Sequence, residues 1–280
     1  MKTKALKKLR EKLSNNEAVY GLWVTLESPS ITEIAVSLGM DWVLIDAEHG
    51  HLDWKDISGH VRAAMRSDTV LVVRIAERST SLSKRALDIG ADGIMIPWMK
   101  SMEEVQKAVS DCNYPPEGRR GIGGERATAW GQCLKEHTAE ANENVLVIPM
   151  IESIDAIPNV ADMCKVDGVE IFFFGPADFS STAGFRGQWE GPGISEKILE
   201  LKNTIKNAGK YCGVVSTSNQ NLNERIDQGF QMLAMGTDNG MILKSLHESL
   251  KKVNRDRSPA TSLDPADGNA LPTSDNENNI

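Results

Sequence analysis

The fold is decided first by residues 41–75, which read DWVLIDAEHGHLDWKDISGHVRAAMRSDTVLVVRI. Two short apolar runs, 41–48 and 70–75, flank a longer segment, 54–66, whose apolar residues recur at helical spacing. A strand, a helix and a second strand in that order form a βαβ unit with parallel strands and a right-handed crossover. The stretch therefore predicts a parallel sheet covered by helices.

The same alternation continues along the rest of the chain. Eight runs are expected to be strands, at 19–25, 41–48, 70–75, 93–98, 145–152, 169–175, 211–216 and 231–236. The expected helices lie at 30–38, 54–66, 79–89, 102–111, 154–164, 195–207, 219–228 and 239–252, after an amphipathic N-terminal helix that carries Ala5, Leu6, Leu9 and Leu13. Eight such units in about 250 residues are typical of a (β/α)8 TIM barrel, an α/β fold. An open doubly wound sheet is the alternative, but it usually has fewer strands.

The composition excludes several other classes of protein. The chain has 280 residues, 40% hydrophobic and 25% charged, which is unlike a disordered, collagen-like or coiled-coil chain. A net charge of −8 offers no basic surface for nucleic acid or an anionic membrane, and no apolar run approaches the ~18 residues of a membrane span. The four cysteines are widely spaced without a C-x-x-C motif, so we expect reduced thiols in a cytoplasmic protein.

The end of the chain differs in composition from the part before it. Residues 254–280 contain three prolines, no lysine and no aromatic residue, with five acidic against two basic side chains. Such a segment cannot bury enough apolar area to offset its chain entropy. We therefore expect a barrel domain at 1–253 and a disordered acidic tail at 254–280.

Polar side chains stand where the expected strands end. In a TIM barrel the catalytic groups gather at the C-terminal ends of the strands, which meet at one mouth. The side chains at those ends are Thr25, Asp46, Glu48, His49, Arg74, Pro97, Trp98, Glu152, Asp178 and Ser216. The sequence therefore predicts one site that contains acids, an arginine and an Asp–His pair.

Two of these acids have the chemistry of metal ligands. Glu152 and Asp178 are oxygen donors on neighbouring strands, and no cysteine or second histidine accompanies them. A few carboxylates with open positions suit Mg²⁺ or Mn²⁺ completed by water and substrate. The structural alternative is that each acid only caps the helix or turn that follows it.

An arginine and a histidine complete the expected site. Arg74 lies among apolar residues and must meet an anion, either a protein carboxylate or a substrate carboxylate. His49 follows Asp46 by three residues, so Asp46 can orient it as a general base. Lys100 lies in an expected loop, which disfavours Schiff-base chemistry. The other histidines are expected to be structural, and they are His51, His60, His137 and His247.

The connection from 112 to 144 is long for a βα unit. Its prolines and glycines oppose regular structure at its start, and we expect a lid or substrate loop. The segment GIGGER, 121–126, follows a proline turn and not a strand, which argues against a phosphate-binding loop.

Several segments resemble one family of enzymes. GLWVTLESPS, DWVLIDAEHG, VVRI, LDIGADGIMIPW, YPPEGRRGIGG, VIPMIES and FFFGPADFS are similar, in order and spacing, to the HpcH/HpaI aldolases, the class II metal-dependent pyruvate aldolases. The resemblance runs from about residue 21 to residue 246. It implies a (β/α)8 barrel with an exchanged C-terminal helix, assembled into a homo-hexamer.

The resemblance also implies roles for individual residues. Glu152 and Asp178 would bind the divalent ion, Mg²⁺ or Mn²⁺ with Co²⁺ as a further option, and Arg74 would stabilise the pyruvate enolate. His49, paired with Asp46, would accept the proton of the aldol hydroxyl. Other positions that match the family's site are Gly175, Pro176 and Ala177 at the pyruvate carboxylate, Trp23 as a lining aromatic, and Asp88 as an acid that reaches a neighbouring subunit's site.

The expected reaction is reversible cleavage of a 4-hydroxy-2-oxo acid into pyruvate and an aldehyde, both small molecules. The same enolate would also serve an oxaloacetate decarboxylase or a macrophomate-synthase-like enzyme. A CoA-ester lyase of the citrate-lyase type would need a basic CoA-binding surface that the sequence does not suggest. A non-catalytic barrel that binds a partner is the alternative from another class.

Two segments depart from the family pattern, GERATAWGQ at 124–132 and the stretch 185–189. They leave the identity of the aldehyde open.

Overall fold

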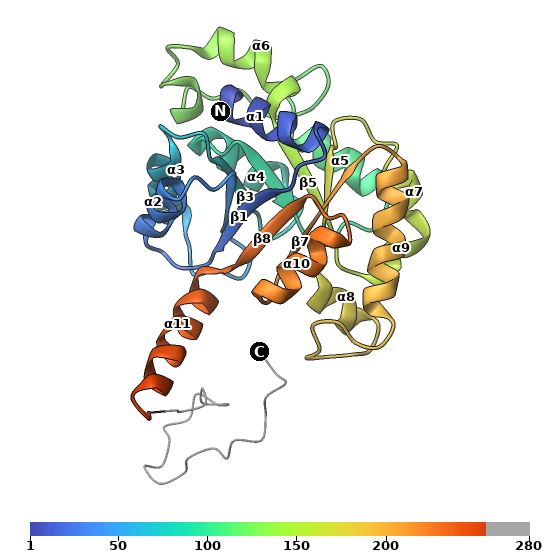
Figure 1. Cartoon of the computed structure of the whole chain (residues 1–280). Helices are drawn as coiled ribbons and strands as arrows, with labels where there is room; N and C mark the ends of the chain where they lie inside the picture. The colour runs from blue at the N-terminus through green and yellow to red at the C-terminus, as the bar shows by residue number, and fades with distance from the viewer. Residues whose placement is uncertain (256–280) are drawn as a thin grey trace.

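Eight parallel strands form a closed barrel in the computed structural model, which describes residues 1–255 (Figure 1). Each strand pairs with its neighbour in the sequence, and β8 closes the barrel on β1. The strands are β1 (Val19–Val24), β2 (Trp42–Asp46), β3 (Val70–Arg74), β4 (Gly93–Ile96), β5 (Leu146–Ile151), β6 (Ile171–Phe174), β7 (Tyr211–Val215) and β8 (Met232–Thr237). The predicted TIM barrel is confirmed, and the open sheet is excluded.

Helices surround the barrel, as the alternating pattern predicts (Figure 1). They are α1 (Thr3–Ser14), α2 (Pro29–Ser37), α3 (Trp54–Ala64), α4 (Thr80–Ile89), α5 (Met102–Cys112), α6 (Leu134–Asn144), α7 (Val160–Met163), α8 (Pro176–Thr182), α9 (Ile194–Asn207), α10 (Asn219–Asp227) and α11 (Asp238–Lys252), with short 3₁₀ helices η1 (Arg126–Thr128) and η2 (Ile154–Asn159).

Two segments differ from the sequence prediction. The connection expected to be a long loop contains α6, which buries only Ala141 and so shows little apolar periodicity. The single helix expected at 154–164 is divided into η2 and α7. Pro158 lies inside η2, where it removes a backbone N–H donor that a continuous α-helix would use.

The core has two parts, because alternate residues of a barrel strand face opposite sides. Inward side chains such as Leu44, Val72 and Ile148 fill the barrel together with Leu6 and Leu9 of α1. Helix α1 therefore closes the end of the barrel opposite the C-terminal ends of the strands. Outward side chains of the strands pack against the surrounding helices.

Beyond its first turn, where the buried Asp238 accepts hydrogen bonds from Thr25, the last helix does not lie against the barrel. Figure 1 shows α11 projecting away from the C-terminal ends of the strands. Its side chains Met241, Ile242, Leu243, Leu246 and Leu250 are exposed to solvent. The disordered tail predicted at 254–280 lies outside the described residues, apart from its first two. Among residues 1–255, no helix is long and apolar enough to span a membrane.

Candidate active site

The core of the site is an ion pair between two neighbouring strands. The register of β2 and β3 sets Asp46 opposite Arg74 at the C-terminal ends of both. Arg74 Nε donates to Asp46 Oδ1 at 3.0 Å, and Arg74 Nη2 donates to Asp46 Oδ2 at 2.6 Å. Both side chains are buried, so this bidentate contact holds the guanidinium in one orientation.

Trp23 of β1 supports the same pair from a third strand. Its indole Nε1 donates to Asp46 Oδ2 at 3.0 Å, and the Arg74 guanidinium lies 4.6 Å from the centre of its ring. Burial alone would raise the pKa of Asp46, but the hydrogen bonds and charge of Arg74 and the Trp23 donor hold that pKa below its usual value. Asp46 is therefore ionised at neutral pH.

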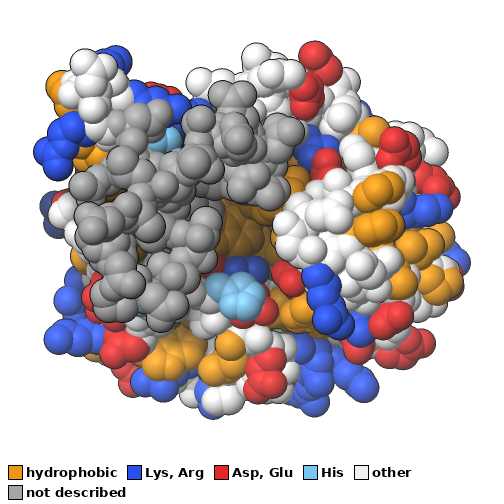
Figure 2. Space-filling view, turned by 90° about the horizontal axis from the view of Figure 1, so that it is seen from below, with side chains coloured by type: hydrophobic (Ala, Val, Ile, Leu, Met, Phe, Trp, Pro, Cys, Tyr) orange, Lys and Arg blue, Asp and Glu red, His pale blue; other side chains and the backbone are white. Residues whose placement is uncertain are grey.

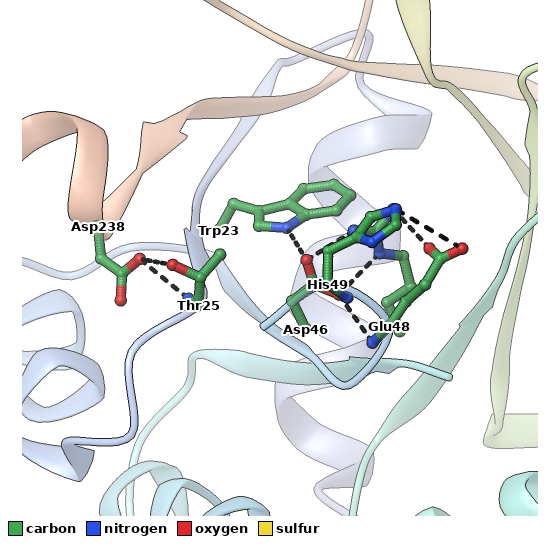
Figure 3. A network of polar contacts seen from close by, with 7 residues as sticks. Trp23, Thr25, Asp46, Glu48, His49 and Asp238 are labelled. Atoms are coloured by element: carbon green, nitrogen blue, oxygen red, sulfur yellow. Dashed lines mark hydrogen bonds and ion pairs between the residues drawn. The ribbon is translucent and has the colours of Figure 1, made fainter. Parts of the chain in front are cut away.

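Asp46 is hydrogen-bonded to the main chain of His49 and not to its imidazole ring. Asp46 Oδ1 accepts the backbone N–H groups of Glu48 at 3.0 Å and His49 at 3.2 Å, which fixes the turn after β2 (Figure 3). The His49 side chain is 69% exposed. The physical reason is that Arg74, Trp23 and the two main-chain groups already use the acceptor positions of this carboxylate.

Glu48 occupies the place between Arg74 and His49. Arg74 Nη1 lies 2.8 Å from Glu48 Oε2, and His49 Nε2 lies 4.0 Å from Glu48 Oε1. Burial raises the pKa of Glu48, while Arg74 and His49 lower it. Sequence reasoning placed Glu48 at the mouth without a role. The available signal was its spacing of two residues from Asp46, which sets both on the same side of an extended chain.

Glu152 lies at the end of β5 and is buried almost completely. Its Oε1 accepts the backbone N–H of Trp98 at 2.7 Å. Trp98 has a φ of 59°, a left-handed conformation that is unusual for a residue other than glycine. Burial raises the pKa of Glu152 to about 7, and the negative charges of Glu48 and Asp178 act in the same direction.

The turn after β6 leaves room beside this carboxylate. A Cβ added at Gly175 would lie 2.6 Å from Glu152 Oε2, so only glycine fits there without moving the acid. Pro176 follows at the first position of α8, Ala177 is exposed, and Asp178 lies in the first turn of α8. The structure therefore places the 175–178 turn next to Glu152.

These residues fit a divalent cation that has open positions. The negative charge of Asp178 acts to raise the pKa of both Glu48 and Glu152, and the charge of Glu48 raises the pKa of Glu152 further. Within residues 1–255, no three His, Cys, Asp or Glu side chains are grouped as a complete protein cage for a metal. Two carboxylates, completed by water and substrate oxygens, are the arrangement that Mg²⁺ accepts.

Asp88 is not brought to this site within the chain. It lies near the C-terminal end of α4, and a helix that follows a barrel strand ends at the opposite side of the barrel from the mouth. There Arg120 Nη2 donates to Asp88 Oδ1 at 2.8 Å.

The other groups meet at the mouth. Figure 2 looks onto this end of the molecule and shows a hollow with apolar side chains inside and acidic, basic and His side chains at its edge. A buried arginine with a fixed orientation lies near a carboxylate cluster that attracts a cation. Such an arrangement can bind a small anion and a metal ion side by side.

Comparison with known proteins shows the family of this chain. The profile of the HpcH/HpaI aldolase/citrate lyase family matches residues 19–245. The chain is 32% identical over 242 residues to a hydroxypyruvate/pyruvate aldolase of Roseobacter denitrificans, covering 86% of this chain and 94% of that protein. It is 33% identical over 233 residues to a 4-hydroxy-2-oxovalerate aldolase of Novosphingobium aromaticivorans, covering 83% of this chain and 88% of that protein.

A solved structure agrees with the fold of the whole barrel. It is an HpcH/HpaI aldolase/citrate lyase family protein of Burkholderia cenocepacia J2315, with a TM-score of 0.84 and 30% identity, covering 88% of this chain and 99% of that chain. The matched region contains every strand of the barrel and all of the residues at its mouth. The chain therefore belongs to the HpcH/HpaI aldolase/citrate lyase family and is a carbon–carbon lyase of the aldolase type.

Proposed function

We propose that this enzyme reversibly cleaves a 4-hydroxy-2-oxo acid into pyruvate and an aldehyde with the help of Mg²⁺ or Mn²⁺. The observation that carries the proposal is the buried Arg74, oriented by Asp46 and located near Glu152 and Asp178. Two relatives support it by their names, a hydroxypyruvate/pyruvate aldolase and a 4-hydroxy-2-oxovalerate aldolase.

Glu152 and Asp178 would hold the divalent ion, which when bound supplies positive charge that polarises a 2-oxo acid. Arg74 contributes a second positive charge to the same substrate. Its Nε and Nη2 donate to Asp46, and its Nη1 forms an ion pair with Glu48 at 2.8 Å, so N–H groups remain for substrate oxygens. The backbone at Gly175, Pro176 and Ala177 would contact the substrate carboxylate, and Trp23 would limit the pocket behind Arg74.

The proton transfer assigned to this chain is made by His49. During cleavage the 4-hydroxyl O–H bond breaks and its proton moves to the imidazole of His49. The electrons of that bond form the aldehyde carbonyl, while those of the C3–C4 bond remain on pyruvate as the enolate. Arg74 then stabilises the negative oxygen of that enolate.

We further propose a cytoplasmic homo-oligomer, a hexamer by family resemblance. The exposed apolar side chains of α11 support an assembly in which a neighbouring copy covers this helix. Asp88 would then contribute to the site of a neighbouring subunit. The four cysteines are free within the described chain, which is consistent with a reducing compartment.

Proton exchange on pyruvate tests the proposal. In deuterated water, NMR should show loss of the methyl proton signal with Mg²⁺ or Mn²⁺ and no loss with a chelator. Absence of exchange under every metal condition would contradict the role of pyruvate as nucleophile. Incubation with oxaloacetate, with and without an aldehyde, then separates aldol chemistry from decarboxylation alone.

A pair of histidine variants tests the proposed base. His49→Ala should lower the rate of aldol cleavage by about 100-fold or more, because general bases typically contribute roughly 100- to 10,000-fold. His51→Ala is the matched control, because His51 is exposed in the same loop and has no role in the proposed reaction. Equal rates of cleavage in His49→Ala and the wild type would exclude His49 as the base.

A further inference from the structure

Of the acids that the sequence predicts at the mouth, Glu48 is the one to which the proposed reaction gives no task. Its side chain is 10% exposed, whereas that of His49 is 69% exposed. Figure 3 shows the Glu48 carboxylate beside the imidazole, on the side away from Thr25 and Asp238. Glu48 therefore lies between the arginine and the proposed base.

The carboxylate of Asp46 cannot serve the His49 ring at the same time. Its two oxygens accept two N–H groups of Arg74, the indole N–H of Trp23 and two main-chain N–H groups. A carboxylate offers about four acceptor positions, so none remains. Asp46 thus orients Arg74 and fixes the turn that carries His49.

One carboxylate oxygen of Glu48 remains available to the His49 ring. Its Oε2 meets Arg74 Nη1 at 2.8 Å, which leaves Oε1 toward the ring. Among residues 1–255, Glu48 is the only acid within 4.0 Å of a His49 ring nitrogen. Apart from Arg74 and His49, the charges that act on Glu48 are those of Asp46 and Asp178, both negative.

We propose that Glu48 is a positioning residue that links Arg74 to His49 and stabilises the charged imidazole. This inference rests on the proposed aldol cleavage. Arg74 holds the Glu48 carboxylate in place, and the carboxylate attracts the Nε2 side of the ring. His49 Nδ1 is then the atom that accepts the proton of the substrate hydroxyl.

The step conserves charge without a further reactant. The hydroxyl O–H bond breaks, a new N–H bond forms at Nδ1, and the imidazole becomes a cation that already carries hydrogen at Nε2. The electron pair of the O–H bond forms the aldehyde C=O bond. The electron pair of the broken C3–C4 bond remains on pyruvate, which leaves as the enolate. Glu48 and the new imidazolium form an ion pair at the 4.0 Å separation of the resting site. In the reverse direction the imidazolium returns the proton.

Histidine NMR tests the contact without requiring catalysis. The metal-free protein is labelled with ¹³C-histidine, and the ring signal that disappears in His49→Gln is assigned to His49. Glu48→Gln keeps the shape of the side chain and removes its charge, so the ring should lose its proton at a pH lower by about half a unit. Glu77→Gln is the matched control, because Glu77 is an exposed acid in the loop after β3. An unchanged titration midpoint in Glu48→Gln, or an equal shift in both variants, overturns the proposal.

Kinetics test the consequence for the reaction. The acid limb of the kcat–pH profile should move to lower pH in Glu48→Gln, with kcat lower by about tenfold at its optimum. Glu48→Asp, which keeps the charge, should retain the position of the limb. An acid limb of Glu48→Gln that coincides with that of the wild type overturns the proposal. Failure of the wild type to exchange pyruvate protons contradicts the proposed function instead, and the histidine titration still decides the Glu48–His49 contact.

Discussion

Arg74 contacts two carboxylates and an indole ring while its side chain is 7% exposed. Burying a guanidinium is costly unless it is paired, and here the pairing is also what orients it. Because Asp46 and Glu48 are buried around it, the three side chains depend on one another. Arg74 therefore affects stability as well as chemistry.

Removal of this cation should destabilise the fold. Arg74→Met leaves Asp46 and Glu48 as buried acids without their counter-ion, and we expect the free energy of unfolding at pH 7 to fall by roughly 3–5 kcal/mol. Urea denaturation measures this change. Arg66→Met is the control, because Arg66 is exposed on the surface and its loss should cost less than about 0.5 kcal/mol. Similar losses in both variants would show that Arg74 does not hold the two acids.

Gly175 offers a second test at the scale of one residue. In Gly175→Ala the new Cβ would meet Glu152 Oε2 at 2.6 Å and Glu152 Cβ at 2.9 Å, so the acid must move. We expect Mn²⁺ affinity, measured by calorimetry, to fall by about tenfold or more, as when support of a ligand is lost. Gly124→Ala is the control, since its Cβ would meet nothing closer than 4.0 Å. Equal Mn²⁺ affinity in the two variants would argue against Glu152 as a ligand.

At the scale of elements, the strands and helices that could be predicted from the sequence are those with many buried residues. The strands were located to within a few residues because each is a short apolar run, and β2, β3 and β5 are buried at every position. Helix α6 was missed because its sequence LKEHTAEANEN has one buried residue. An element that packs weakly leaves a weak pattern in its sequence.

Helix α11 shows the converse, because its apolar side chains are left exposed by the other residues of the described part, 1–255. Leu246 is 59% exposed, and burial against a neighbouring copy would contribute roughly 1.5–3 kcal/mol per subunit. Leu246→Glu should therefore shift the protein toward smaller species in size-exclusion chromatography with light scattering. Ser245→Glu adds the same charge one position away and should keep the molar mass of the wild type. If Leu246→Glu also keeps it, α11 is not part of the interface.

For the whole molecule, the half-buried His137 contributes to the pH dependence of stability. Burial lowers the pKa of His137 to about 4, with the N-terminal amine and Arg120 acting in the same direction. The unfolded chain, in which His has its ordinary pKa near 6.5, therefore binds more protons than the folded chain between these values. This contribution to stability is complete above about pH 6.5 and is lost as the pH falls toward 4.

A single variant isolates this effect. His137→Phe keeps an aromatic ring against Tyr114 and removes the titrating group. Between pH 7 and pH 5 the wild type should lose about 1 kcal/mol more unfolding free energy than the variant, with partial exposure allowed for. Chemical denaturation at both pH values measures the difference, and other groups, including Glu152, cancel in it. Parallel losses in the two proteins would contradict the assignment.

The sequence alone determined the barrel and the residues at its mouth. Strand ends such as Asp46, Arg74 and Glu152 are defined by position along the chain, and barrel closure brings them together by geometry. The pairing of side chains was decided only in three dimensions. Asp46 contacts Arg74 and Trp23, whereas Glu48 lies near His49. A buried guanidinium is stabilised by two carboxylates, and its hydrogen bonds to Asp46 use acceptor positions that the imidazole of His49 would need. Sequence spacing shows which side chains can meet, whereas desolvation and competition for hydrogen bonds select the pairs that form.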